Sequence, residues 1–313
     1  MDDLLFSLNI IFPLLVMMLV GYAARSLKLL GSDATRQINS CIFKIFLPLS
    51  LFFSIMDTEV GTAIDVTTLV YAFFASLVCF AALFVLVPRI CPDRASCGVL
   101  IQGIARSNYA IFGIPLAMMI YPDADTSIVV LMVVVAVPVF NVLSTIALMV
   151  YGGQKPSLKG LLKGVALNPL IISTVVGFAM WGLQWSLPAL VESPLRSLAS
   201  LSTPLALFSL GAALDFQKAR TNLRLIVTGV VGKLVVVPLI FLSAGIALGI
   251  RDVSLSALIA LYATPTSVSS FPMAQAMGGN ADLAGAQVVF STAFSILTVF
   301  LWVFVLRSLG FLA

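Results

Sequence analysis

Two interrupted apolar stretches decide the fold of this chain: SNYAIFGIP at residues 107–115 and TPTSVSSFP at residues 264–272. Each places small polar residues and proline near the middle of a segment that is otherwise apolar. Proline lacks a backbone N–H and clashes with the preceding turn, which disfavours an unbroken helix through either stretch. Unpaired backbone groups are too costly to face lipid, so such breaks belong where protein or a water-filled cavity covers them. Interrupted helices at matching positions of two halves indicate the substrate site of a transporter.

The composition is that of a polytopic helical membrane protein. Of the 313 residues, 61% are hydrophobic and 10% are charged, and the mean hydropathy is +1.14. A membrane-spanning helix needs about 20 apolar residues. Ten stretches approach this length, near residues 6–24, 37–56, 67–87, 96–120, 126–151, 161–183, 195–214, 222–249, 254–277 and 283–306. We therefore expect an all-α fold with ten transmembrane helices, broken in helices 4 and 9, and no enzymatic domain.

Several kinds of site are not expected. The chain has no His, and its four cysteines show no CxxC spacing, which favours free thiols and no metal site. Glycine motifs that bind nucleotides are absent, so we expect no nucleotide cofactor. The N-terminal sequence lacks the basic region and cleavage site of a signal peptide, so the first apolar stretch is expected to be a retained helix. The net charge of +4 reflects membrane topology and implies no nucleic-acid partner.

Basic residues collect on one side of the predicted membrane topology. Eleven fall in loops of one side: Arg25, Lys28, Arg36, Arg89, Arg94, Lys155, Lys159, Lys163, Lys218, Arg220 and Arg224. Only Arg196, Arg251 and Arg307 fall on the other side, together with most of the acids. The positive-inside rule assigns the basic side to the cytoplasm. The sequence thus predicts a multi-pass protein of the plasma (bacterial inner) membrane whose N- and C-termini are both outside, that is, periplasmic.

The sequence repeats itself at an interval of 156–157 residues. PLLVMMLVGYA at 13–23 matches PLIISTVVGFA at 169–179, and PLSLF at 48–52 matches PLALF at 204–208. The two broken stretches continue the series, although predicted helices 3 and 8 show no convincing match. Each unit holds five helices, and an odd number of crossings inverts the second unit. We predict two inverted five-helix repeats, at 1–151 and 161–313, joined by a short cytoplasmic loop at 152–160.

Three basic residues are predicted inside membrane spans, Lys44, Arg106 and Lys233, and no acid accompanies them. Intramembrane charges are costly and indicate function. Arg106 lies roughly 15 Å along its helix, at 1.5 Å per residue, and two positions before Asn108. A cation beside a broken helix suits an anionic substrate. The alternative is that the side chain reaches the membrane interface or pairs with exposed carbonyls, which is the favoured interpretation for Lys44.

The breaks also supply hydrogen-bonding side chains and helix N-termini. The predicted substrate ligands are Arg106, Ser107, Asn108 and Tyr109 in the first break and Thr266, Ser267, Ser269 and Ser270 in the second. Asn108 is the strongest candidate among the uncharged residues, since any single Ser or Thr can instead satisfy a backbone group freed at a proline. Gly113, Pro115, Pro265 and Pro272 are predicted to keep the helices broken. Asn141 and Gln287 are interpreted as interhelical hydrogen-bonding residues.

These residues resemble the auxin efflux carrier family over the full chain. The likeness is carried by Ser107–Tyr109 with Gly113–Leu116, by Pro265–Pro272, and by GGNADL at 278–283. The resemblance implies an inverted repeat with crossed helices 4 and 9, a scaffold of helices 1, 2, 6 and 7, a moving transport bundle and a homodimer. Asn108 matches the Asn of the family's first crossover, and Pro115, Pro265 and Pro272 match its crossover prolines.

The chain also departs from the plant members of that family. Ser107 stands where the plant pattern has Pro, Thr266 and Ser267 replace a larger amide, and the long hydrophilic loop is missing. The departures make auxin itself a doubtful substrate, and the bacterial relatives are associated with malate or malonate. We expect an elevator-type secondary transporter of a small organic anion, with Na⁺ or H⁺ as open choices of coupling ion. The alternatives are a sodium-coupled symporter of the bile-acid type, a channel and a membrane ligand sensor.

Overall fold

The computed structural model describes residues 2–57, 65–91, 93–121, 127–152, 158–214 and 222–312, and all regular structure within them is helical. The α-helices of the first half are α1 (Asp2–Ser26), α2 (Ser32–Cys41), α3 (Leu47–Met56), α4 (Val66–Ile90), α5 (Arg94–Ala105), α6 (Ile114–Ile120) and α7 (Ser127–Tyr151). Those of the second half are α8 (Leu158–Ala166), α9 (Pro169–Gly182), α10 (Ala189–Ser200), α11 (Ser202–Ala213), α13 (Leu223–Val231), α14 (Val237–Ala247), α15 (Asp252–Tyr262), α16 (Ser270–Ala276) and α17 (Ala281–Ser308). The structure also has three π-helical turns. The turn η1 (Ile42–Phe46) joins α2 to α3, η2 (Tyr109–Gly113) precedes α6, and η3 (Gly232–Val236) joins α13 to α14.

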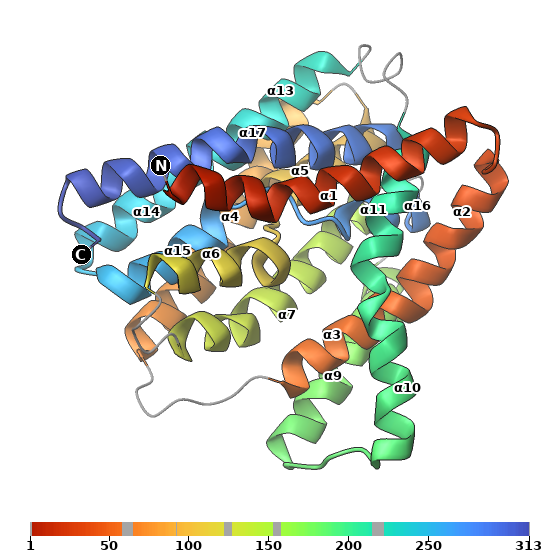
Figure 1. Cartoon of the computed structure of the whole chain (residues 1–313), viewed down its shortest axis with the longest axis horizontal. Coiled ribbons are helices and arrows are strands. Elements are labelled where there is room, and N and C mark those ends of the chain that lie inside the picture. The colour runs from red at the N-terminus through yellow and green to blue at the C-terminus, as the bar shows by residue number, and fades with distance from the viewer. Residues whose placement is uncertain are drawn as a thin grey trace.

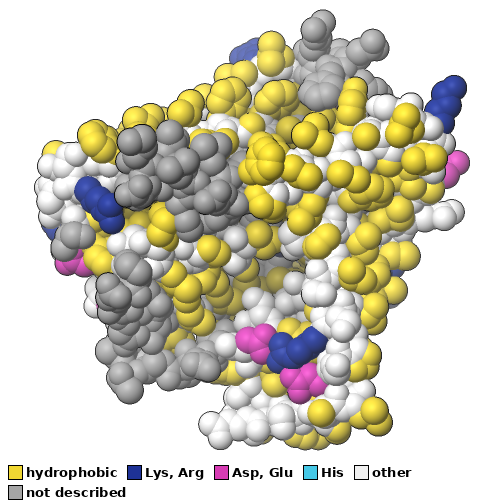
Figure 2. All heavy atoms as spheres, in the orientation of Figure 1, with side chains coloured by type: hydrophobic (Ala, Val, Ile, Leu, Met, Phe, Trp, Pro, Cys, Tyr) yellow, Lys and Arg dark blue, Asp and Glu magenta, His cyan; other side chains and the backbone are white. Residues whose placement is uncertain are grey.

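The molecule is a multi-pass membrane protein. Five continuous helical segments are long and apolar enough to cross a membrane: 32–56, 66–90, 128–151, 223–247 and 281–308. Shorter apolar helices lie at 12–26, 109–120, 169–182 and 252–262. Hydrophobic side chains cover most of the face shown in Figure 2, and the few charged side chains visible there are scattered in small groups. An apolar outer surface of this extent suits lipid as the surrounding solvent.

The helices form two groups (Figure 1). We call α1, α2, η1, α3, α9, α10 and α11 the panel, and α4–α7 with α13–α17 the bundle. In Figure 1, α2, α3 and α9–α11 stand on the right, most of the bundle lies on the left, and α1 runs across from one to the other. Within the panel, α1 packs along α11 and α9 packs along α3.

Several helices of the second half begin or end 156–157 residues after a helix of the first half. The interval is 157 between Val66 and Leu223, where α4 and α13 begin, and between Ile90 and Ala247, where α4 and α14 end. It is also 157 between the ends of α7 and α17, at Tyr151 and Ser308, and 156 between the ends of α1 and α9. The helices at 66–90 and 223–247 are thus equivalent in length and position although their sequences do not match.

Glycines permit close backbone packing at both panel contacts. A Cβ on Gly21 of α1 would lie 1.9 Å from the carbonyl oxygen of Phe208 in α11. A Cβ on Gly177 of α9 would lie 3.3 Å from the carbonyl oxygen of Phe52 in α3. Gly177 lies 156 residues after Gly21, and Phe208 lies 156 residues after Phe52. The same pair of positions therefore makes the same contact in both halves, more tightly in one than in the other.

Candidate functional site

The two broken segments cross each other inside the bundle, each pairing with the other's backbone. Helix α5 ends at Ala105 and α15 ends at Tyr262, and Ser107 and Thr266 form an antiparallel bridge beyond these ends. The N–H of Asn108 donates to the carbonyl of Pro265 at 2.8 Å, and the N–H of Ser267 donates to the carbonyl of Arg106 at 3.3 Å. The breaks thereby satisfy backbone groups that would be too costly to leave unpaired within a membrane.

The predicted helix-breaking residues take different places. Pro272 lies in the first turn of α16, where its missing N–H has no intrahelical partner to lose. Gly113 and Pro115 lie beyond the first break, inside the continuous helical segment 109–120 formed by η2 and α6, where Pro115 removes one backbone donor from that segment. Pro265 lies in the extended crossing itself and contributes only its carbonyl. Gly113 lets η2 approach α15, because a Cβ there would lie 2.8 Å from the carbonyl oxygen of Ala260.

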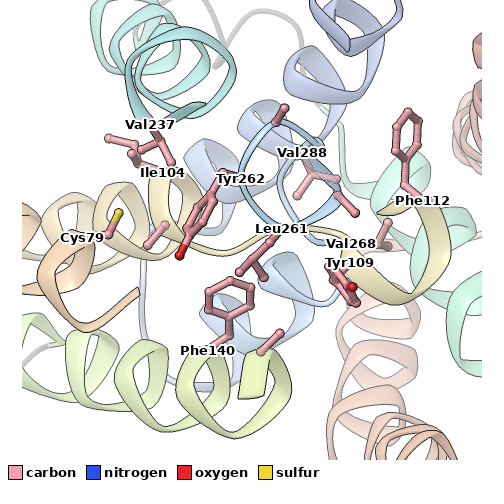
Figure 3. Packing of buried hydrophobic residues seen from close by; sticks show 14 of the residues in the cluster. Cys79, Ile104, Tyr109, Phe112, Phe140, Val237, Leu261, Tyr262, Val268 and Val288 are labelled. Carbon is pink, nitrogen blue, oxygen red and sulfur yellow. The ribbon is translucent and has the colours of Figure 1, made fainter. Parts of the chain in front are cut away.

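Beside the crossing lies a cavity of about 110 Å³ between the bundle and the panel. This is a few times the ~30 Å³ that one water molecule occupies in the liquid, so the cavity suits a small solute. Its lining comes from α3 and η2, the crossing, α7 and α11. In Figure 3, Tyr109 and Val268 lie close together on one side of the crossing, and Phe140 projects from α7; all three line this cavity. The polar lining residues are Ser50, Ser54, Arg106, Ser107, Asn108, Tyr109, Asn141, Ser202, Thr203, Ser267 and Ser269.

Arg106 gives the cavity a positive charge. It is the one charged side chain in the described lining, and only 5% of its surface is exposed. One guanidinium nitrogen donates to Oδ1 of Asn141 at 2.8 Å, and another lies 3.0 Å from the sulfur of Met273. Both partners are neutral, and no carboxylate of the described residues lies within ion-pair distance. A buried cation beside a cavity that has only neutral partners is suited to an anion.

Three donors in the cavity wall have no partner within the described part of the protein. They are the side-chain amide nitrogens of Asn108 and Asn141 and the hydroxyl of Ser202. The hydrogen bond from Arg106 fixes the orientation of the Asn141 amide, so that its NH₂ group is free to donate. Buried polar groups are normally paired, and unpaired donors beside a cation are suited to carboxylate oxygens.

Six of the eight predicted ligands line this cavity: Arg106, Ser107, Asn108, Tyr109, Ser267 and Ser269. The hydroxyl of Tyr109 donates to the carbonyl of Val129 at 2.6 Å, and the hydroxyls of Ser267 and Ser269 bond to each other at 2.9 Å. These hydroxyls are therefore bonded within the wall. In contrast, the amide nitrogen of Asn108 has no partner in the described structure, and the guanidinium of Arg106 has no anionic partner there.

Thr266 and Ser270 lie away from the cavity lining. The Thr266 hydroxyl donates to the carbonyl of Gly103 at 2.7 Å, near the end of α5, so it satisfies a backbone group there. Helix α16 has only seven residues, and the N–H groups of Ser270 and Phe271 donate to the carbonyls of Ser267 and Val268. These N–H groups are therefore already bonded to the chain just before α16, so recognition of a ligand here depends on side chains.

The two remaining intramembrane lysines differ sharply. Lys44 lies in η1 with its side chain exposed. Lys233 lies in η3 with none of its surface exposed, and its ammonium donates to the hydroxyl of Ser107. Neither lysine lines the cavity.

Sequence reasoning missed part of the cavity wall. Ser50, Ser54, Ser202 and Thr203 come from panel helices that carry no break, and Asn141 was assigned to interhelical packing. The available signal was the repeat, since Ser202 and Thr203 lie two residues or fewer before the PLALF segment that matches PLSLF. Among the described residues, no group of three or more His, Cys, Asp or Glu side chains could hold a metal ion.

An all-helical membrane protein with crossed, interrupted helices and a buried cationic cavity belongs to the class of membrane transporters. Residues 6–303 match the family described as "Membrane transport protein", and the chain belongs to this family, which includes the auxin efflux carriers. The sequence-based recognition of that family is thus confirmed, and the protein is a transporter rather than an enzyme.

Curated relatives of this chain are transporters from bacteria and archaea. The chain is 23% identical to the "Uncharacterized transporter YfdV" of Escherichia coli (strain K12), over 97% of this chain and 99% of that protein. It is 21% identical to an "Uncharacterized transporter" of Methanothermobacter thermautotrophicus, over 96% and 98%. It is 27% identical to the "Putative malonate transporter" of Rhizobium meliloti (strain 1021), where the match spans 50% of this chain and 49% of the relative.

Proposed function

We propose that this protein is a secondary active transporter of a small organic anion, a carboxylate of the malonate or malate type. The observation that carries the proposal is the cavity at the crossing, where Arg106 has only neutral partners and the amides of Asn108 and Asn141 retain free donors. A carboxylate would neutralise the buried guanidinium and accept hydrogen bonds from these amides and from Ser202.

The size and charge of the cavity favour a compact anion over auxin. The volume of about 110 Å³ leaves little room for a fused aromatic ring system with a side chain. The partial match to a relative named as a malonate transporter supports the same class of substrate. In this proposal Arg106, Asn108 and Asn141 bind the carboxylate, while Ser107, Tyr109, Ser267 and Ser269 shape the wall.

The transport cycle we propose is alternating access of the elevator type. The chain would comprise ten membrane crossings arranged as inverted repeats at 1–151 and 161–313, joined through 152–160. Support comes from the 156–157-residue interval between element ends and from the equivalent contacts of Gly21 with Phe208 and Gly177 with Phe52. The bundle would move against the panel, and the cavity lies where these two groups meet.

We propose that the protein resides in the plasma membrane with both termini outside, following the distribution of basic residues. Large apolar side chains remain exposed on panel helices, including Leu19 of α1, Leu190 of α10 and Val175 of α9. Lipid covers such a face in a monomer, and a second copy would cover part of it in the homodimer that we predict.

A binding screen of the purified protein tests the substrate class. Malonate, malate and succinate are expected to raise the midpoint of thermal unfolding, whereas the matched amide malonamide is not. The screen is repeated with sodium replaced by choline and across pH, which separates a sodium-coupled carrier from one that needs no cation. Stabilisation by malonamide equal to that by malonate would contradict an anion site, and binding without flux in liposomes would indicate a sensor.

A further inference from the structure

Lys233 is the most deeply buried charged residue of the described chain, and the anion site does not include it. None of its surface is exposed, and it lies in η3, the π-helical turn between α13 and α14. Its ammonium donates to the hydroxyl of Ser107 and, at 3.4 Å, to the carbonyl of Tyr262. No carboxylate of the described residues lies within ion-pair distance of it. An ammonium held by neutral oxygens alone in a membrane protein requires a specific reason.

The reason lies in the C-terminus of α15, which ends at the crossing. The last four carbonyls of a helix have no intrahelical partner. Here Ile259 accepts from the N–H of Ala263, and Ala260 accepts from the hydroxyl of Thr264. Leu261 accepts from the hydroxyl of Ser107, and Tyr262 accepts from Lys233.

All four carbonyl groups are therefore satisfied, and a positive charge faces the negative end of the helix dipole.

Ser107 links this arrangement to the anion site. Its hydroxyl accepts a hydrogen bond from Lys233 and donates one to Leu261, and it directly precedes Asn108 in the chain. The ammonium thus fixes the extended segment that carries Asn108.

Aromatic side chains pack around the helix end that Lys233 contacts. The Tyr262 hydroxyl donates to the carbonyl of Ala72 at 3.1 Å, and its ring stacks on Phe241 at a centroid separation of 5.2 Å. Figure 3 shows Cys79, Ile104, Val237 and Tyr262 gathered on one side of the crossing, opposite Tyr109, Val268 and Phe112. The position 157 residues before Lys233 is Ser76, so only one half of the protein carries this charge.

The π-helical turn that places Lys233 is itself stabilised by another helix. Pro238 lacks the N–H that would bond to the carbonyl of Leu234, and the indole N–H of Trp302 in α17 donates to that carbonyl at 2.9 Å. Single π-turns within helices occur frequently at functional sites. The backbone here is thus built to direct one lysine at the crossing.

We propose that the Lys233 ammonium is a tethered cation that takes the place of a soluble coupling cation at the crossing. Unwound carbonyls and half-helix C-terminal ends coordinate the coupling ion in sodium-driven carriers with broken helices. In this chain the lysine contacts the helix-end carbonyl of Tyr262 and the hydroxyl of Ser107, so the anion site is assembled without sodium. The consequence, sodium-independent transport, rests on the proposed function, whereas the role of Lys233 in holding the crossing together does not.

Chemical rescue tests the tethered cation. In Lys233→Ala the lost atoms correspond to propylammonium, a small cation that can be added to the purified protein. We expect Lys233→Ala to lower the thermal midpoint and to abolish stabilisation by malonate, and we expect propylammonium to restore both saturably. Propanol has nearly the same shape without charge and is expected to restore neither. The matched control is Lys44→Ala, an exposed lysine in the π-turn η1, which propylammonium should leave unchanged.

Four outcomes distinguish the tethered cation from the alternatives. Equal rescue by propanol would show that Lys233 only fills space, and sodium-dependent malonate binding by the unmodified protein would overturn the substitution for a coupling cation. A Lys233→Met protein with the stability and malonate response of the unmodified chain would also overturn the proposal. Rescue of stability by propylammonium, together with no carboxylate response in any variant, would leave the tethered cation intact and refute the proposed function instead.

Discussion

The side-chain amide of Asn39 donates a 2.6 Å hydrogen bond to Oε1 of Gln275, and this bond joins the panel helix α2 to the bundle helix α16. Asn39 is buried, with 1% of its surface exposed, so the two helices are closely packed at this point. The predicted topology assigns the contact to the cytoplasmic half of the protein. A bundle that moves against the panel has to break this bond.

Linking Asn39→Cys to Gln275→Cys with a short bis-maleimide is therefore expected to arrest uptake. The experiment uses a background without Cys41, Cys79, Cys91 and Cys97, which are free thiols in the structure. The single-cysteine variants treated with the same reagent serve as controls and should transport normally. Full uptake by the cross-linked protein would show that panel and bundle do not separate here during transport.

Asn141→Asp should inactivate the anion site without unfolding the protein. The new carboxylate would keep the acceptor for Arg106 and neutralise the guanidinium from within, so that an anionic substrate meets no net positive charge. We expect an unchanged or higher thermal midpoint and no stabilisation by malonate. Asn141→Ser, which adds no charge, is the control and should retain a weakened response. A malonate response in Asn141→Asp equal to that of the unmodified protein would remove this residue from the site.

Asn108→Ala should abolish uptake while leaving membrane insertion and folding intact. The substitution removes the unpaired amide donor but retains the backbone N–H that bonds to Pro265. Uptake and the yield of folded protein are measured together. The matched control is Ser269→Ala, whose hydroxyl bonds to Ser267 and supplies wall structure. Uptake by Asn108→Ala at the unmodified rate would refute the assignment.

Gly21→Ala should destabilise the panel more than Gly177→Ala. The added methyl group would lie 1.9 Å from a backbone oxygen in the first case and 3.3 Å in the second, so the first substitution forces the helices apart much further than the second. Overpacking of this kind costs about 1–3 kcal/mol. Thermal unfolding of both variants in the same detergent measures the difference. Equal midpoints would show that the contact of α1 with α11 is looser than described.

The carboxylate of Asp65 should stabilise the protein above about pH 4, the usual range of an Asp pKa. Burial raises the pKa of Asp65, but hydrogen bonds from Ser254 and Thr68 outweigh burial and lower it overall. A pKa that is lower in the folded state contributes stability above the unfolded value and loses it as the pH falls through the folded value. Asp65 also caps α4, so Asp65→Ala should cost about 0.5–2 kcal/mol at pH 7.

A pH titration of the thermal midpoint checks this prediction. The difference between the unmodified protein and Asp65→Ala is expected to shrink as the pH falls from 5 toward 3. A difference that stays constant over this range would show that the charge of Asp65 contributes nothing to the cap.

The breaks and the cavity cation could be predicted because their causes are local in sequence. A cluster of proline and small polar residues in the middle of an apolar span is visible in the sequence, and so is an arginine two positions before Asn108. The partners of Arg106 could not be predicted in the same way, since Asn141 and Met273 lie on other helices at sequence separations of 35 and 167. Side-chain identity gives no indication of which distant helix a residue faces.

Other features that the sequence did not reveal also have physical causes. The span predicted at 161–183 is divided between α8 and α9 at Leu167 and Asn168, where Asn168 caps α9 and its amide bonds to the hydroxyl of Thr145. The equivalence of 66–90 and 223–247 escaped sequence comparison, because helix length is constrained by the membrane whereas individual apolar side chains are interchangeable. The buried state of Lys233 likewise depends on Ser107, 126 residues away.

Uptake of radiolabelled malonate into proteoliposomes tests whether the buried guanidinium of Arg106 binds the transported anion. We predict saturable uptake by the unmodified protein with choline in place of sodium, and competition by malate but not by malonamide. Arg106→Gln should lose at least tenfold in uptake, since a hydrogen bond to a charged group contributes about 1.5–3 kcal/mol. Arg106→Gln that folds and transports like the unmodified protein would contradict the assignment of the buried guanidinium as the anion receptor.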